Sequence, residues 1–220
     1  MNRQERHALT LGLTTLLAAL GAPKASAQVQ NEVWPEVQYH HWFNGRTQAV
    51  ASMASSFNSS TQMKFQTEQS LSLEYRFTDI FFGRIGIWRG GATEGDNYNE
   101  KQLQLDQTFR VQMPSKIIAE YRTREDFRST DTGFSMRFRE RIQIQRGFTV
   151  GSYTFTPYTS AEVYWDTRYG RLSRYRLTVG VRLPVFNRHY SFDPYLVHQV
   201  DTAGDSEVTN GLGLRFNITF

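Results

Sequence analysis

Beyond residue 27, the sequence alternates between apolar and polar side chains with a period of two residues. In residues 70–77, every odd position is leucine, tyrosine or phenylalanine, and every even position is serine, glutamate or arginine. The alternation returns, with few exceptions, in residues 102–111, 134–145 and 174–183. Successive side chains of a strand point to opposite faces, so each stretch predicts a strand with one apolar and one polar face. Because no stretch beyond residue 27 shows the 3.6-residue period of an amphipathic helix, we expect an all-β fold.

The composition of the polar face separates a soluble β-sandwich from a membrane barrel, since both folds alternate. The chain has 21 Arg and only 4 Lys, and the arginines share their stripes with Glu, Asp and Gln. Such residues suit the interior of a closed barrel, whereas Leu, Ile, Val and Phe on the other face suit contact with lipid. A membrane helix is excluded beyond residue 27, because the apolar runs are short and the mean hydropathy is -0.53. The pattern predicts one antiparallel transmembrane β-barrel over residues 28–220.

The number of strands follows from the positions of the alternating stretches. Eleven strand-like stretches lie near residues 33–43, 46–57, 65–77, 81–89, 99–112, 117–127, 133–145, 153–166, 171–183, 190–200 and 208–220. Bacterial single-chain barrels normally have an even number of strands, so we expect about twelve. Ten strands are expected instead if residues 28–43, which contain Pro35, lie outside the wall.

The connections between these stretches alternate in character. Short connections, expected on the periplasmic side, lie at 78–79, 113–116 and 184–189. Connections that are polar and longer on average, expected on the outer side, lie at 90–99, 128–132 and 201–207.

Residues 1–27 have the three parts of a secretory signal peptide. Arg3 and Arg6 give a basic start, residues 8–22 form an apolar segment, and residues 25–27 (ASA) form a small-x-small cleavage site. We expect cleavage after Ala27, which divides the chain into a signal peptide at 1–27 and a barrel at 28–220.

The last ten residues, GLGLRFNITF, resemble the closing strand by which outer-membrane barrels are recognised for insertion. Apolar residues occupy alternate positions up to the terminal aromatic residue, and we assign the assembly signal to Phe216, Ile218 and Phe220. Arg215 departs from the pattern, because that signal often carries glycine there. The resemblance implies the outer membrane of a Gram-negative bacterium, with outer-membrane lipid and the barrel-assembly machinery as partners.

The mature chain also resembles a family of small Gram-negative outer-membrane β-barrels that is known only as a domain of unknown function. The resemblance covers nearly all of residues 28–220 and rests on short motifs: the early strand with Trp34, MRFRERIQI at 136–144, SAEVYW with Glu162, YLVHQ at 195–199 and the terminal aromatic strand. It implies fold and location rather than an activity. Glu140 breaks the alternation within its strand and is expected to face lipid unless a bulge turns it inward.

The arginine-rich face gives the main functional hypothesis, a small channel whose lumen passes or binds small anionic solutes. Assignment by alternation puts twelve arginines inside (Arg76, Arg84, Arg110, Arg122, Arg124, Arg137, Arg139, Arg141, Arg174, Arg176, Arg182 and Arg215) against six carboxylates (Glu74, Asp106, Glu120, Asp126, Glu162 and Asp166). A surplus of guanidinium groups in a confined lumen attracts anions. The alternative hypothesis is a structural or surface barrel that internal salt bridges close.

Within that face, we assign a set of lumen-lining residues. They are Arg110, Arg122, Arg137, Arg139, Arg141, Arg174, Arg176 and Arg182, with Glu120 and Glu162 as their partners. The arginines at 137–141 and 174–182 are expected to form one ladder on neighbouring strands.

Other chemistry has weak support in the sequence, and we expect neither an enzyme nor a cofactor. His198, with Asp205 and Ser206 in the next loop, makes a lipid-modifying hydrolase the least favoured alternative. His40 and His41 point to opposite faces of a strand, so no metal site is expected there. No phosphate-binding glycine loop occurs. Without residues 1–27 the chain has 22 basic and 20 acidic residues, and nucleic acid is not an expected partner.

Overall fold

The computed structural model describes residues 28–58, 66–92, 99–203 and 207–220. These residues form strands and one short 3-10 turn, η1 (Pro114–Lys116). The strands are β1 (Gln28–Trp42), β2 (Thr47–Asn58), β3 (Gln66–Arg76), β4 (Phe81–Ala92), β5 (Asn99–Met113), β6 (Ile117–Thr130), β7 (Gly133–Arg146), β8 (Phe148–Val150), β9 (Tyr153–Asp166), β10 (Arg171–Val185), β11 (Asn187–Asp201) and β12 (Glu207–Thr219). Within the described residues, no helix is long and apolar enough to cross a membrane. The all-β fold is confirmed.

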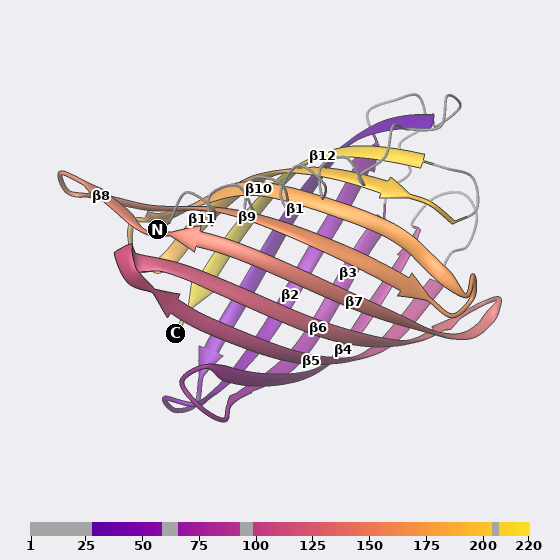
Figure 1. The fold of residues 1–220 in the computed structure, drawn as a ribbon, viewed down its shortest axis with the longest axis horizontal. Coiled ribbons are helices and arrows are strands. Elements are labelled where there is room, and N and C mark those ends of the chain that lie inside the picture. Colours follow the sequence, from indigo (N-terminus) through magenta and orange to yellow (C-terminus); the bar gives the residue numbers. More distant parts are fainter. Residues whose placement is uncertain (1–27, 59–65, 93–98, 204–206) are drawn as a thin grey trace, which may run out of the picture.

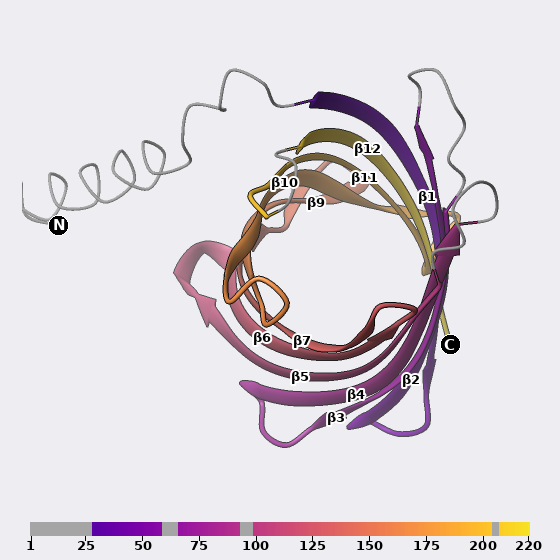
Figure 2. The same cartoon turned by 90° about the vertical axis from the view of Figure 1, so that its right-hand side faces the viewer.

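The strands close into a barrel whose wall has eleven members (Figures 1 and 2). Strands β1 to β7 and β9 to β12 pair in chain order, and β12 returns to pair with β1. Strand β8 pairs only with the start of β9 and extends the β7–β9 hairpin beyond its neighbours (Figure 1). The described strands therefore total about twelve, as expected, and the eleven wall strands match the eleven alternating stretches.

The expected even number of wall strands is not observed. In a meander each strand reverses the direction of the previous one, so eleven strands leave the first and the last pointing the same way. The closing pair is accordingly parallel, with continuous register from Gln28↔Glu207 to His40↔Thr219. One pair of the barrel thus differs from the antiparallel pattern predicted for all of it.

Strand β1 belongs to the wall in spite of Pro35, so the ten-stranded alternative is wrong. Its pairing with β2 runs from Glu32↔Asn58 to Trp42↔Gln48 but is interrupted at Trp34 and Pro35. Proline has no N–H group to donate, which explains the interruption. The pairing of β1 with β12 continues through Pro35 without a break.

The wall has apolar side chains on its outer face and charged side chains on its inner face, which is the reverse of a water-soluble protein. Large apolar side chains such as Ile87, Val179 and Leu196 are more than half exposed on the outside. Carboxylates such as Asp126, Asp166 and Asp193 are completely or almost completely buried on the inside. A barrel that turns apolar side chains outward and encloses its charges is suited to a lipid environment.

The two ends of the barrel differ, and we call them the turn end and the loop end. The turn end carries the connections at 43–46, 77–80, 114–116 and 186, together with the terminal residue Phe220. The loop end carries the turns at 131–132 and 167–170 and the first residues of β1 and β12. Because β1 and β12 are parallel, Gln28 and Phe220 lie at opposite ends of the wall.

Two of the expected outer connections are partly outside the described residues, which omit 93–98 and 204–206. The expected connection at 128–132 is wrong in its extent, because β6 continues to Thr130. Arg128 lies in this strand, opposite Gln102 of β5. Its side chain turns inward, where it finds carboxylate partners.

Aromatic rings gather at the turn end and form a girdle. Phe77 contacts Tyr75 and Phe81 at centroid distances of 4.9 and 5.3 Å, and Phe81 stacks on Phe109 at 4.8 Å. The pair Phe148 and Phe155, and the group around Phe220, continue the girdle on other strands. Such girdles mark the level at which a membrane barrel meets the lipid headgroups.

Phe220 joins the three strands at the closing seam. Its ring lies 5.1 Å from His189 and 6.3 Å from both Tyr39 and Tyr190. Its N–H donates to the carbonyl of His40 at 2.9 Å, and its own carbonyl accepts from Trp42 N–H at 2.7 Å. The terminal residue therefore extends the β1–β12 pairing by backbone hydrogen bonds.

Candidate functional site

The inward face of the loop-end half contains a buried group of charges centred on Arg128. Its side chain is 2% exposed and binds both carboxylate oxygens of Glu100, itself 2% exposed. It also donates to Asp166 Oδ2 at 2.6 Å. Asp166 additionally pairs with Arg137 at 3.4 Å and Arg168 at 3.1 Å. We call Glu100, Arg128, Arg137, Asp166 and Arg168 the loop-end network.

A second group lies nearer the middle of the wall and is built on Glu162. Its carboxylate accepts from Arg122 at 2.7 Å and pairs with Arg139 at 3.1 Å. The hydroxyl of Tyr164 donates to the same carboxylate at 2.7 Å. Beside this group, Arg124 binds both oxygens of Asp106 at 2.5 and 2.7 Å. Bidentate pairs of this kind hold both partners in one orientation.

Tyr164 collects guanidinium groups from two strands. The carbon at the centre of each guanidinium group lies 4.7 Å from the ring centroid for Arg139, 5.9 Å for Arg137, and 5.5 Å for both Arg174 and Arg176. The tyrosine side chain is only 1% exposed. Cations are attracted to the face of an aromatic ring, so Tyr164 helps to hold four positive charges in one region.

The arginines of β7 and β10 do not lie on neighbouring strands as expected, because β9 separates them. Arg139 is opposite Tyr164, which in turn is opposite Arg174. Arg141 stands in the same relation to Glu162 and Arg176. Strand β9 thus supplies acceptors between two rows of arginines, where the sequence suggested a continuous ladder of positive charge.

Arg174 and Arg176 have different partners on β11. Arg174 pairs with Asp201 at 2.6 Å. Arg176 donates to the neutral side-chain oxygen of Gln199 at 2.6 and 3.0 Å and stacks over Trp34 at 5.4 Å.

Arg110 and Arg182, near the turn end, are the most exposed of the arginines that form ion pairs. Glu120 accepts from Arg110 at 2.8 Å and from Arg141 at 2.7 Å. Arg182 approaches Asp193 only to 3.9 Å. Arg110 and Arg182 are each 44% exposed, so water reaches this mouth of the barrel more freely than the loop-end network.

Aromatic rings fill another part of the interior beside the closing seam. Tyr158, Tyr195 and Val197 form a buried cluster against Trp34. The ring of Tyr195 lies over Gly213, where an added Cβ would come within 2.0 Å of it. Arg215, the departure from the terminal pattern, lies next to this cluster and pairs with Glu36 at 2.7 Å. On its other side, the guanidinium group of Arg215 lies 3.6 Å from the carboxylate of Asp193.

Arginines and carboxylates are far more evenly matched than alternation suggested. Among the described residues, and leaving aside the surface pair Arg76–Asp79, twelve arginines form ion pairs with ten carboxylates. The partners missed from the sequence include Glu36, Glu100, Asp193 and Asp201. Glu100 continues the even-numbered polar positions of β5, and that signal could have found it. Asp193 stands between Phe192 and Pro194, a context typical of a turn.

The other candidate residues lie outside this interior. His198 faces outward, with Nδ1 2.9 Å from Asn210 Oδ1, while Asp205 and Ser206 lie outside the described residues. Glu140 also faces outward, because the register of β7 with β6 continues without a bulge, and it accepts a hydrogen bond from Tyr121. No group of three His, Asp or Glu side chains suited to a metal ion occurs in the part of the chain that the structure describes.

A closed wall, an apolar exterior and an interior of paired charges define a β-barrel of the transmembrane class. The sequence matches the family described as "Protein of unknown function (DUF2490)" over residues 10–209. The chain therefore belongs to this family, and the expected relationship to a domain of unknown function is confirmed.

No curated protein matches the sequence. Among solved structures, the fold is similar to the crystal structure of the beta domain of the Bordetella autotransporter Brka, with a TM-score of 0.49 and 11% sequence identity. The match covers 77% of this chain and 82% of that chain.

Proposed function

We propose that the protein is an integral outer-membrane β-barrel with a closed interior, serving as a structural or surface protein rather than an open channel. The observation that carries this proposal is the pairing of the buried arginines with carboxylates. Arg128 has two carboxylate partners, and Glu120, Glu162 and Asp193 each serve two arginines. Guanidinium groups held in this way are not free to bind a passing solute.

Three features support insertion in the outer membrane. The outward face is apolar, the girdle at the turn end marks one lipid interface, and Phe220 completes a terminal aromatic strand. The signal-like segment at 1–27 provides a route across the inner membrane. Assembly then requires the barrel-assembly machinery, and outer-membrane lipid is the main partner of the wall.

A second candidate function is the binding of small anionic solutes at the turn end. Arg110 and Arg182 are the most exposed of the lumen-lining residues named from the sequence, and Arg182 is 3.9 Å from its nearest carboxylate. These two arginines suit a shallow vestibule for anions. This candidate function places anion binding at one mouth of the barrel and does not require a continuous pore.

Planar-bilayer recording on the refolded chain 28–220 tests the closed interior. We expect insertion without a steady current if the paired charges and aromatic rings close the lumen as proposed. A steady, anion-selective current through the wild-type protein would overturn the proposal and favour the channel. Insertion is checked separately by the shift in gel mobility on heating, so that silent but inserted protein is distinguished from protein that fails to insert.

The double variant R139S/R174S separates the two hypotheses further. In a closed barrel it should lower the yield of folded protein, because Glu162 loses Arg139 and Asp201 loses Arg174. In an open channel it should fold normally and reduce anion preference. The variant R110S/R182S is the matched control for folding, since it removes two arginines from the more exposed mouth and should leave the yield of folded protein unchanged.

A further inference from the structure

Two adjacent basic side chains lie on the outward face near the loop end. Arg89 of β4 and Lys101 of β5 are direct cross-strand partners, and both side chains are exposed. Among the described residues, neither makes an ion pair with a carboxylate. Like charges directly opposite each other on one face of a sheet repel, so this pair destabilises the bare wall. An anion between the two side chains would remove that repulsion.

The position of the pair along the barrel matches a lipid headgroup layer. On the same two strands, Phe81 and Phe109 form part of the girdle at the turn end and are also cross-strand partners. Arg89 and Lys101 lie eight residues further along each strand. At ~3.4 Å per residue and a strand tilt of about 40°, this separation is about 20 Å along the barrel axis.

That separation is close to the height of the apolar band of a membrane barrel, about 25 Å. The outward residues between the two pairs include Ile85, Ile87, Leu103 and Leu105, which are suited to acyl chains. Long basic side chains also extend beyond their Cα positions toward the interface. The basic pair therefore reaches the headgroups of the leaflet on the loop side.

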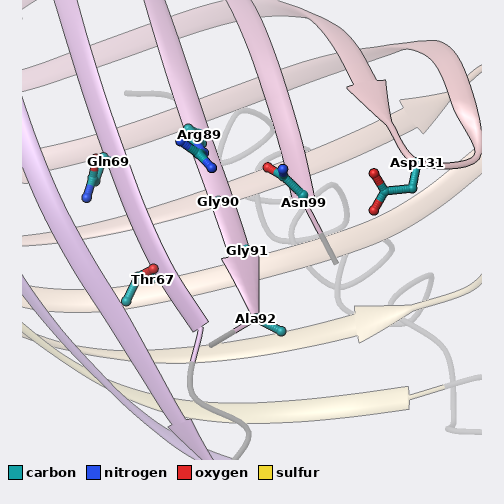
Figure 3. A pocket seen from close by; sticks show the side chains of 8 residues that line it. All are labelled: Thr67, Gln69, Arg89, Gly90, Gly91, Ala92, Asn99 and Asp131. Carbon is teal, nitrogen blue, oxygen red and sulfur yellow. The ribbon is translucent and has the colours of Figure 1, made fainter. Parts of the chain in front are cut away.

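A hollow beside Arg89 gives space for a headgroup. It has a volume of about 580 Å³ and is lined by residues of β3, β4 and β5 and by Asp131 (Figure 3). Thr67, Gln69 and Asn99 provide hydroxyl and amide groups that donate hydrogen bonds. Among the described residues, Asp131 is the one acidic side chain in this lining, and the basic pair Arg89 and Lys101 outnumbers it.

We propose that Arg89 and Lys101 bind the phosphate of an anionic lipid headgroup in the leaflet at the loop end. The guanidinium group can bind two phosphate oxygens, and the ammonium group adds a second positive charge on the opposite strand. This proposal rests on the membrane insertion proposed above but not on whether the lumen is closed.

The test is native mass spectrometry of the barrel released from nanodiscs that contain phosphatidylcholine and a minor fraction of phosphatidic acid. We expect the wild-type protein to retain phosphatidic acid in preference to phosphatidylcholine. The variant R89Q/K101Q should lose this preference by about tenfold or more. Each basic side chain near an anionic surface contributes about 1 kcal/mol, which is about fivefold in a binding constant.

The matched control is K116Q/R146Q, which removes the same charge at the turn end, where Lys116 adjoins the partner of Arg146. It should keep the preference. Preference retained by R89Q/K101Q, or lost equally in the control, would overturn the site. Excess inorganic phosphate should not displace the lipid, and displacement would show a free-anion site instead. A protein that never enters the nanodisc would contradict membrane insertion itself, a different failure from insertion without preference.

Discussion

Replacing Arg128 by methionine tests whether the loop-end network holds the barrel together. The methionine side chain keeps much of the volume of arginine but removes its charge and its donors. Among the described residues, Glu100 would then retain the hydrogen bond from Gln102, at 2.8 Å, and a more distant electrostatic interaction with Arg137. Asp166 would retain its pairs with Arg137 and Arg168. The main consequence is therefore a buried carboxylate at Glu100 that has lost its ion-pair partner, where the side chain is 2% exposed.

The expected cost of R128M follows from this burial. Removing one partner of a buried ion pair typically destabilises a protein by about 3–5 kcal/mol. Replacing both partners by apolar residues leaves no buried charge and is often close to neutral. We therefore expect E100M/R128M to be more stable than R128M alone, although it carries one more substitution. The control R182M removes an arginine that is 44% exposed and 3.9 Å from its partner, and it should cost less than about 1 kcal/mol.

Equilibrium unfolding in urea of the barrel folded in lipid vesicles measures these differences. The 4 Trp of the chain provide the fluorescence signal. A cost for R128M within about 1 kcal/mol of the R182M control would refute the proposed strength of the network. A double variant less stable than R128M would refute the argument that the isolated carboxylate is the source of the cost.

Three further predictions concern assembly and orientation. Deleting Phe220 should abolish the heat-modifiable barrel in outer-membrane fractions, because it removes the ring contacts and backbone hydrogen bonds at the seam. The control Phe186→Ala should assemble normally, because the Phe186 ring at the same end is 92% exposed. The chain has 0 Cys, so a single introduced cysteine can be labelled selectively. With the loop end outside the cell, Val29→Cys should react with a membrane-impermeant maleimide on intact cells. Gly45→Cys, in a turn at the other end, should react only after the outer membrane is permeabilised, and the reverse result would invert the orientation. Intact-mass analysis should show cleavage after Ala27, and a mature protein that keeps the first residues would contradict the signal peptide.

The wall of the barrel could be predicted from the sequence because its cause is local. A strand that separates lipid from an enclosed interior must alternate, and the eleven alternating stretches correspond to the eleven wall strands. The expected even number came from the usual form of bacterial barrels, not from these residues. Nothing in residues 28–43 signals a parallel partner, since the pairing of β1 depends on a strand at the other end of the chain.

The interior could be predicted only in part, because alternation gives the face of a residue but not its partner. Glu120 and Glu162 do pair with arginines, as suggested. The position of β9 between β7 and β10 follows from chain order, because the stretch at 153–166 lies between those at 133–145 and 171–183, and the expected ladder on neighbouring strands overlooked it. Arg128 was expected in a connection because it lies near a strand end, where period-two patterns fade.

The parallel seam between β1 and β12 constrains how a wall of this kind can arise. Duplicating a hairpin adds two strands, so hairpin duplication alone converts an even wall only into another even wall. Eleven strands require the gain or loss of a single strand at some step. Removing β1 would leave ten wall strands whose closing pair, β2 with β12, is antiparallel, and both remaining chain ends would lie at the turn end. One strand thus determines on which side of the membrane the barrel begins.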